Sequence, residues 1–238
     1  MYDYSAYTFN STNPLRRLSH RTRFAIALQK LTMVSPLKSV LDYGCGDGFF
    51  LRKVSQTFTQ NTDLLLVGLE KYPTIYAKTQ EVNEFSIFHT NEDVFTAIEG
   101  KEKFQFVTIL EVLEHCNPKT QVMILNEAGS LLSHDGKIII SVPIEIGIPA
   151  LVKNIFRFRL NPKRRFSGYS LTNILKSLLH IPIPEYRNKD EYLTHMGFNF
   201  RDLEGLISQQ FTILEKQFSP FGFAHFFNSQ VFFVIQKK

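Results

Sequence analysis

Residues 40–48 read Val-Leu-Asp-Tyr-Gly-Cys-Gly-Asp-Gly, and they are the most informative residues of the sequence. An apolar strand pattern over Ser39–Tyr43 runs directly into three alternating glycines, and a helical pattern over Asp47–Gln60 follows them. Glycines allow a sharp turn and let the backbone approach a ligand without an intervening side chain. The start of the following helix offers free N–H groups. The order of strand, glycine turn and helix therefore predicts a nucleotide-binding turn.

Short apolar runs alternate with helical patterns on both sides of this turn. Near-continuous apolar runs suit strands that are buried on both faces of a parallel sheet. The alternation predicts an α/β fold with a doubly wound, mostly parallel sheet. The predicted strands are Ser39–Tyr43, Leu64–Leu69, Phe85–His89, Phe104–Leu110 and Lys137–Val142, and the predicted helices include Asp47–Gln60, Thr74–Val82 and Pro118–Leu132, the last capped by Asn117.

The C-terminal part differs in pattern. A helix over Arg201–Gln209, capped by Asn199, precedes two strands, Phe211–Phe218 and Gln230–Gln236, which we expect to form an antiparallel hairpin at the sheet edge. Residues 143–195 carry no strand pattern, and insertions of this length are commonly lids. We predict one domain over 1–238, with an N-terminal helical cover (1–37), a cofactor-binding core (38–143), a basic helical lid insertion (144–197) and a C-terminal helix and strands (198–238).

Composition narrows the class of protein. The chain has 238 residues, of which 44% are hydrophobic and 21% are charged, and this usage argues against disorder. No apolar run approaches the roughly 20 residues that a membrane span requires. The two cysteines, Cys45 and Cys116, show no metal-binding spacing, which favours a reducing compartment. We therefore expect a soluble, cytoplasmic protein without a transmembrane segment.

The net charge of +5 is unevenly distributed along the chain. Residues 1–40 and 143–198 each carry a net +5, whereas residues 41–142 carry −6. Basic flanks around an acidic middle suggest that the flanks contact an anionic partner. The alternative is a solvated surface with uneven charge.

An acidic residue follows the second predicted strand. Glu70 lies 22 residues after Gly48, where a carboxylate accepts hydrogen bonds from the hydroxyl groups of a ribose. Phe49 stands where a dinucleotide-binding fingerprint requires its third glycine, which argues against a nicotinamide-dependent enzyme. Asp42 and Asp47 disfavour a pyrophosphate and suit a cationic ligand. S-adenosylmethionine has a ribose, an ammonium and a sulfonium but no phosphate, and it fits these residues.

The segment 41–48 resembles the first motif of class I S-adenosylmethionine-dependent methyltransferases. The resemblance continues through Glu70, through 104–115 and through the predicted strand that ends at Pro143. It implies a seven-stranded sheet with a reversed last strand. It also implies a set of cofactor-binding residues: Asp42, Tyr43, Gly44, Cys45 and Gly46 for the methionine part, Glu70 for the ribose, the backbone around Leu110 for the ammonium, and Asn91 for the adenine amino group. Asn91 stands where the family usually has an acidic residue.

Acidic and histidine side chains follow the fourth predicted strand. Glu111, Glu114 and His115 lie at the carboxyl edge of the sheet, where ligands of open α/β sheets bind. A neutral histidine can take the proton of a hydroxyl acceptor, so His115 is the leading candidate base. Taken alone, His115 suits a packing or capping role equally well.

The pattern Glu-x-x-Glu-His with a later histidine resembles two groups of methyltransferases. These are the ubiquinone-biosynthesis O-methyltransferases and the small-RNA terminal 2′-O-methyltransferases, in which such a quartet is associated with a divalent metal. The resemblance places His195 as the fourth member beside Glu111, Glu114 and His115, and the carboxylates favour Mg²⁺ or Mn²⁺.

The basic lid bears on the acceptor. Between 151 and 190 nine Lys or Arg residues face two acidic ones, and Ile148–Leu160 has an amphipathic pattern. This segment suits a pocket cover with solvated charges, peripheral contact with anionic membrane headgroups, or binding of the phosphates of a nucleotide sugar or RNA. No RNA-binding module is recognisable. We therefore expect O-methylation of a small or lipid-linked, phosphate-bearing acceptor. The alternatives are an RNA 2′-O-methyltransferase with a divalent metal and a non-catalytic cofactor-binding module.

Overall fold

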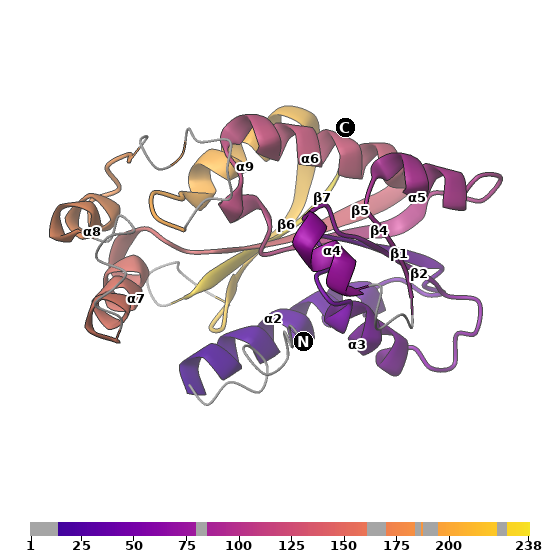
Figure 1. Cartoon of the computed structure of the whole chain (residues 1–238), viewed down its shortest axis with the longest axis horizontal. Coiled ribbons are helices and arrows are strands. Elements are labelled where there is room, and N and C mark those ends of the chain that lie inside the picture. Colours follow the sequence, from indigo (N-terminus) through magenta and orange to yellow (C-terminus); the bar gives the residue numbers. More distant parts are fainter. Residues whose placement is uncertain (1–13, 80–84, 161–169, 184–186, 188–194, 223–227) are drawn as a thin grey trace.

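A seven-stranded sheet forms the centre of the molecule (Figure 1). The computed structural model describes residues 14–79, 85–160, 170–183, 187, 195–222 and 228–238. The strand order is β3-β2-β1-β4-β5-β7-β6, in which β7 runs antiparallel to both of its neighbours and the other strands are parallel. The expected mostly parallel sheet and its C-terminal antiparallel hairpin are confirmed. The strands are β1 (Ser39–Tyr43), β2 (Leu65–Leu69), β3 (Ser86–Phe88), β4 (Phe104–Leu110), β5 (Leu132–Pro143), β6 (Phe211–Ser219) and β7 (Gln230–Lys237).

Helices cover both faces of this sheet, as a doubly wound fold requires. Figure 1 shows α2 (Pro14–Thr32) and α3 (Phe49–Thr57) below the sheet, and α5 (Asn91–Ala97), α6 (Pro118–Leu131) and α9 (Phe200–Gln210) above it. The remaining helices are α4 (Pro73–Thr79), the 3-10 turn η1 (Leu113–His115), α7 (Gly147–Leu160) and α8 (Leu171–Leu178). In the same view α7 and α8 lie beyond the end of β5, at the edge toward which the parallel strands run.

Two hydrophobic clusters pack against the two faces. Phe24 and Ala27 of α2 pack with Phe50 of α3 against sheet residues such as Phe106. On the opposite face, residues of α6 and α9 pack against the sheet, among them Leu125, Leu131 and Leu203. The side chains that alternate along β4 therefore enter different clusters, which explains why its sequence is apolar almost throughout.

Some helices and strands have the predicted ends and caps, and others begin or end at different residues. Asn117 accepts a hydrogen bond from the Thr120 N–H, and Asn199 accepts one from the Arg201 N–H, as expected of N-caps. The helix predicted from Asp47 begins at Phe49 instead, because Gly48 is left-handed with φ +73°. The strand predicted from Lys137 begins earlier, at Leu132. Of the helix predicted over 74–82, the described residues extend to Thr79, where α4 ends. Asn13 and most of 161–194 also lie outside the described residues.

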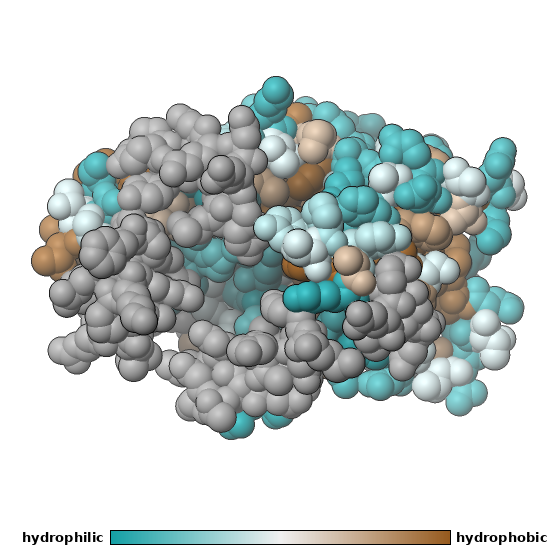
Figure 2. Space-filling model, viewed as in Figure 1, coloured by the Kyte–Doolittle hydropathy of each residue, from teal (hydrophilic) through white to brown (hydrophobic). Residues whose placement is uncertain are grey.

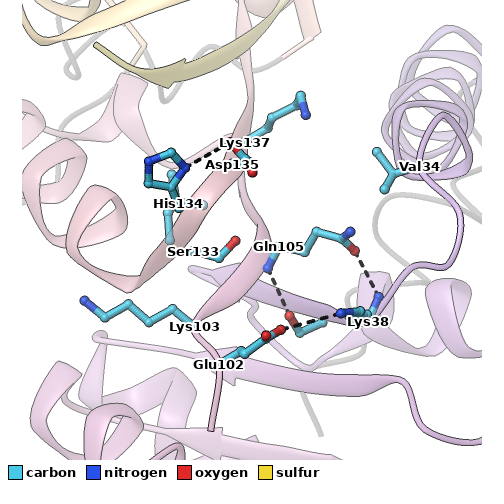
Figure 3. A pocket seen from close by; sticks show the side chains of 11 residues that line it. Val34, Lys38, Glu102, Lys103, Gln105, Ser133, His134, Asp135 and Lys137 are labelled. Carbon is cyan, nitrogen blue, oxygen red and sulfur yellow. Dashed lines mark hydrogen bonds and ion pairs between the residues drawn. The ribbon is translucent and has the colours of Figure 1, made fainter.

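A hollow of about 670 Å³ opens at the opposite edge of the sheet from the glycine turn (Figure 3). It lies at the amino ends of β1 and β4, where Gln105 accepts a hydrogen bond from the Lys38 N–H and donates its own N–H to Ser39 Oγ. The Lys38–Glu102 ion pair at its rim is exposed. Because ligands of open parallel sheets bind at the carboxyl ends of the strands, the functional site is expected at the other edge of the sheet. No helix in the described ranges is long and apolar enough to cross a membrane.

Candidate active site

The glycine turn joins β1 to α3 at the carboxyl edge of the sheet. Gly44, Gly46 and Gly48 all have positive φ, at +78°, +56° and +73°. A Cβ on Gly44 would lie 2.5 Å from Cγ2 of Val112, so this position needs glycine for space as well as for conformation. A Cβ on Gly46 would meet no protein atom within 4 Å. The turn is thus closed against the loop after β4 at Gly44 and open at Gly46.

Glu70 points its carboxylate back into this turn. Its Oε2 accepts a hydrogen bond from the Gly46 N–H at 2.9 Å, and its Oε1 accepts one from the Tyr72 N–H at 2.8 Å. The side chain is buried, and this burial raises its pKa above the ordinary value for a glutamic acid. Both backbone bonds fix the carboxylate at the place where the sequence predicts ribose binding.

Asp42 is a buried acid within β1. The Thr108 hydroxyl donates a 2.7 Å hydrogen bond to its Oδ1. Burial raises the pKa of Asp42 from 3.8 to about 7, against the lowering effect of the Thr108 bond, and the nearby charge of Glu70 raises it further. A cation bound near this carboxylate would relieve the electrostatic cost, which suits the ammonium of S-adenosylmethionine.

Asn91 begins α5, a helix that the sequence patterns did not predict. Its neighbours Glu92 and Asp93 are exposed, and Asp93 forms a reciprocal cap with Thr90. The side chain of Asn91 hydrogen-bonds Glu127. Its Oδ1 is buried and has no hydrogen-bond partner among the residues that the structure describes. A buried amide oxygen of this kind requires a donor, and the amino group of an adenine would supply one.

Three further predicted cofactor residues have clear structural roles. The Tyr43 hydroxyl donates to Glu127, which also accepts a hydrogen bond from Lys71 Nζ at 2.7 Å. Cys45 is buried, and burial raises the pKa of its thiol well above the ordinary value, so it is unsuited to nucleophilic chemistry. Leu110 ends β4 beside the hydrophobic cluster under α2. Any contact of these residues with the cofactor would have to come mainly from their backbone.

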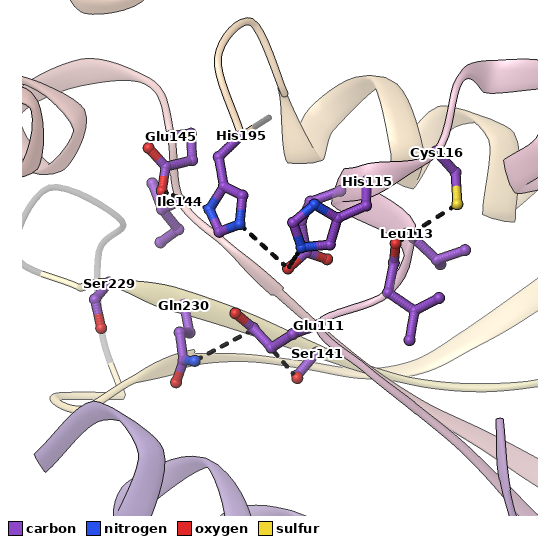
Figure 4. A network of polar contacts seen from close by, with 12 residues as sticks. Glu111, Leu113, His115, Cys116, Ser141, Ile144, Glu145, His195, Ser229 and Gln230 are labelled. Carbon is purple, nitrogen blue, oxygen red and sulfur yellow. Dashed lines mark hydrogen bonds and ion pairs between the residues drawn. The ribbon is translucent and has the colours of Figure 1, made fainter. Parts of the chain in front are cut away.

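Glu111 lies directly after β4 with φ +58°, a left-handed conformation that is unusual for glutamate. Its N–H donates to the Ser141 carbonyl. The carboxylate pairs with Arg23 of α2 at 3.0 Å and accepts a hydrogen bond from Gln230 Nε2 at 3.3 Å. The carboxylate of Glu111 is therefore already compensated by a buried arginine. Figure 4 shows the contacts of Glu111 with Gln230 and Ser141.

The environment of Glu114 differs from that of Glu111. The side chain is completely buried, and neither carboxylate oxygen has a hydrogen-bond partner within the described part of the chain. Burial raises its pKa well above the ordinary value, and the charge of Glu111 adds to this effect. Two imidazole nitrogens lie near its Oε1: His115 Nε2 at 3.7 Å and His195 Nε2 at 4.0 Å.

Glu114, His115 and His195 form one compact group of donor atoms. One ligand atom from each residue lies within 4.8 Å of the others, and the two imidazole rings stand edge to face with their centroids 4.7 Å apart (Figure 4). One carboxylate and two imidazoles are suitable ligands for a divalent cation. Three of the four predicted residues thus meet, whereas Glu111 is directed toward Arg23.

Sequence reasoning missed three residues that contact the four predicted site residues. Arg187 donates hydrogen bonds to the carbonyls of Glu114 at 2.9 Å and Cys116 at 2.7 Å. Glu145 contacts His195, and Arg23 contacts Glu111. Each of these residues is far from its partner in sequence, so no local pattern could have indicated the contact.

The parallel sheet with one reversed strand, the glycine turn and the acidic residue after β2 define a class I S-adenosylmethionine-dependent methyltransferase. The family model described as "Methyltransferase domain" matches residues 15–181. The chain belongs to this family. Sequence comparison with curated proteins finds no match.

Solved structures share the fold at low sequence identity. A protein from Pyrococcus horikoshii OT3 is 17% identical with a TM-score of 0.60, over 99% of this chain and 96% of that chain. The magnesium protoporphyrin IX methyltransferase from Synechocystis PCC 6803, with bound SAH, is 16% identical with a TM-score of 0.56. The match covers 96% of this chain and 89% of that chain. The plantazolicin methyltransferase in complex with SAH is 14% identical with a TM-score of 0.56. The match covers 97% of this chain and 87% of that chain.

Proposed function

We propose that this methyltransferase transfers the methyl group to an oxygen atom, with the acceptor hydroxyl bound beside Glu114, His115 and His195. The observation that carries the proposal is the buried carboxylate of Glu114, which has two imidazoles as near neighbours and no hydrogen bond to a described residue. A buried carboxylate is costly unless a proton or a cation compensates it. This group can therefore hold and pass on the proton that a hydroxyl acceptor loses.

The cofactor site that we propose lies between the glycine turn and the loop after β4. Glu70 would accept hydrogen bonds from the ribose, Asn91 Oδ1 would accept one from the adenine amino group, and Asp42 would attract the ammonium. The cofactor supplies an electrophilic methyl carbon on a sulfonium. This site fits the compound because its acidic residues match the positive charge and its open face at Gly46 leaves room for the ligand.

The chemical step requires alignment and one proton transfer. The acceptor oxygen forms a bond to the methyl carbon as the carbon–sulfur bond breaks, and the bonding electron pair stays on sulfur. His115 takes the hydroxyl proton on its imidazole, and Glu114 stabilises the resulting imidazolium. The protein must also orient the acceptor oxygen toward the methyl carbon and exclude water from the site.

The same three residues would hold a divalent metal if the enzyme uses one. Glu114, His115 and His195 would be its protein ligands, and Mg²⁺ or Mn²⁺ suits the carboxylate. Such an ion would lower the pKa of an acceptor hydroxyl. Glu111 would then contribute through its charge, since Arg23 already pairs with its carboxylate.

We further propose a lipid-linked, anionic acceptor. Large apolar side chains are exposed along α8 and just beyond it: Leu171 (67%), Leu175 (55%), Leu179 (66%) and Ile181 (47%). The first three repeat every four residues and so share one helix face. Figure 2 shows hydrophobic atoms at the left end of the molecule, where α8 lies in Figure 1. An apolar helix face within a basic segment suits shallow insertion into an anionic membrane surface.

The proposed reaction is tested by incubating the protein with S-adenosylmethionine labelled in its methyl group and with total lipid or total RNA. We expect label in the lipid fraction, and transfer to RNA would favour the alternative 2′-O-methyltransferase. His115→Ala and His195→Ala should each abolish transfer while SAH affinity stays within about twofold in calorimetry. The exposed His134 gives the matched control, His134→Ala, which should retain full activity. Binding of SAH without transfer to any acceptor would indicate a non-catalytic module.

A further inference from the structure

Glu145 is a buried carboxylate that the proposed reaction has not yet used. It lies two residues after the end of β5 and is only 3% exposed. Its Oε1 lies 3.3 Å from Nδ1 of His195, a residue fifty positions later in the chain. Figure 4 shows the two side chains directed toward each other, with the other edge of the His195 ring facing His115.

Lys153 of α7 fixes Glu145 in this place. Its Nζ donates hydrogen bonds to the carbonyls of Ile144 and Ser229, each at 3.0 Å, and lies 3.4 Å from Glu145 Oε1. The ammonium is thus anchored to backbone on both sides of the carboxylate. Glu145 Oε1 accepts a hydrogen bond from this ammonium, so the oxygen that faces His195 is already an acceptor.

We propose that Glu145 is the positioning residue for His195, and that it places the imidazole proton on Nδ1. Glu145 Oε1 accepts a hydrogen bond from Lys153 and lies 3.3 Å from Nδ1, so Nδ1 is the donor in this contact and the Nε2 nitrogen of the neutral ring carries the lone pair. This nitrogen is the one that lies 4.0 Å from Glu114 Oε1. Glu145 therefore directs the basic nitrogen of His195 into the candidate active site.

The contact also fixes the orientation of the ring. The side chain of His195 is 26% exposed, and its backbone lies near the C-terminal end of the insertion 144–197. The hydrogen bond to a carboxylate anchored by Lys153 opposes a ring flip, which would replace Nδ1 by a carbon on the Glu145 side and Nε2 by a carbon on the Glu114 side. For histidines that bind a metal, loss of a carboxylate that holds the other ring nitrogen typically lowers metal affinity or activity 10- to 100-fold.

The inference rests on the proposed function of His195, but its first test is independent of activity. In the full-length chain with SAH and a chelator, ¹⁵N shifts of the histidine side chains report which nitrogen carries the proton. We expect the Nδ1–H form for His195 at a pH where the ring is neutral. Observation of the Nε2–H form in the unsubstituted protein would overturn the proposal, whatever the outcome of the methyl-transfer assays.

Substitutions provide the second test. Glu145→Ala should shift His195 to the Nε2–H form and lower kcat about 10- to 100-fold, with SAH affinity and Tm little changed. Glu145→Asp, which keeps a carboxylate, should restore part of the Nδ1–H population and of kcat. In a His195→Ala background the Glu145→Ala change should have no further effect on kcat. An additional loss in that background would show that Glu145 acts independently of His195.

The exposed pair His134–Asp135 gives a matched control. Asp135 Oδ1 lies 3.0 Å from His134 Nδ1, and both side chains are almost fully exposed. Asp135→Ala removes the same kind of contact outside the site and should change neither the His195 shifts nor kcat. An equal loss of kcat in Asp135→Ala and Glu145→Ala would contradict the proposal.

Discussion

Arg23 of α2 and Glu111 of the loop after β4 form an ion pair, with 3.0 Å between Nη2 and Oε2. The guanidinium side chain is 4% exposed and the carboxylate side chain 16%. The N-terminal helix thereby contacts the loop that carries the candidate catalytic residues. Glu111 also accepts a hydrogen bond from Gln230 of β7, so its position depends on elements from both ends of the chain.

Removing Arg23 should destabilise the protein strongly. Arg23→Met leaves the Glu111 carboxylate without its buried partner, and losses of this kind are about 3–5 kcal/mol. The double variant Arg23→Met/Glu111→Gln should recover part of the loss, because it removes the uncompensated charge. Urea unfolding measures both. The exposed Lys38–Glu102 pair is the control, and Lys38→Met should cost less than about 1 kcal/mol.

Gly44→Ala and Gly46→Ala should differ in their effect on the stability of the protein. Both positions have positive φ, which costs a non-glycine residue about 1–2 kcal/mol. Only at Gly44 would the new methyl group also meet Val112, so Gly44→Ala should lower Tm further than Gly46→Ala. Val112→Ala should rescue part of the Gly44→Ala loss. Equal Tm values for the two glycine variants would contradict this account of the turn.

Asp42 should make cofactor binding depend on pH. Its pKa is about 7 in the folded chain, and the ionised carboxylate is the form that attracts an ammonium. SAH affinity should therefore rise between pH 5.5 and 7.5, as measured by calorimetry. Asp42→Asn should bind SAH more weakly at pH 7.5 and lose this dependence. A slope that persists in Asp42→Asn would assign it to another group.

The Asp42 carboxyl should also make the free energy of unfolding depend on pH. Its contribution to this energy should fall with rising pH, whereas SAH affinity should rise. Because its folded pKa exceeds its unfolded value, the folded chain holds the proton more tightly than the unfolded chain. Its contribution to the free energy of unfolding should therefore fall as the pH rises from about 4 to about 7. Asp42→Asn should remove this component, which urea unfolding across the same pH range would detect.

The exposed leucines of α8 should govern membrane binding. Leu171→Ser/Leu175→Ser/Leu179→Ser removes the apolar face and should weaken binding to phosphatidylglycerol–phosphatidylcholine vesicles at least 10-fold in sedimentation. Leu214, 48% exposed on β6, and Met33, 71% exposed after α2, provide the control Met33→Ser/Leu214→Ser. If the control double variant weakens binding as much as the triple variant does, α8 is not the contact surface.

The sequence predicted the elements around the glycine turn best. Both β1 and β4 have the predicted bounds, because each is an apolar run that ends at a functional loop. The short helices α5 and α8 were not predicted. Their N-caps are Thr90 and Ser170, and a single capping hydroxyl before seven or eight helical residues is a weak signal.

The position of part of the candidate site could be predicted from the sheet topology alone. Glu114 and His115 come directly after β4, so the carboxyl edge of the sheet was their expected place. The partners of this group were not predictable. Glu145, Arg187 and Arg23 act through long-range contacts, and an ion pair or a carbonyl contact between distant residues leaves no periodic pattern in the sequence.

Lys153 anchors the root of the lid to two backbone carbonyls, one after β5 and one before β7. The base of the insertion is thereby part of the rigid scaffold, whereas the surface that α8 presents lies farther along the chain. If α8 contacts the acceptor as proposed, acceptor choice and chemistry are separable, because α8 carries none of Glu114, His115 and His195. A relative in which only the exposed face of α8 differs could then take another acceptor with these three residues unchanged.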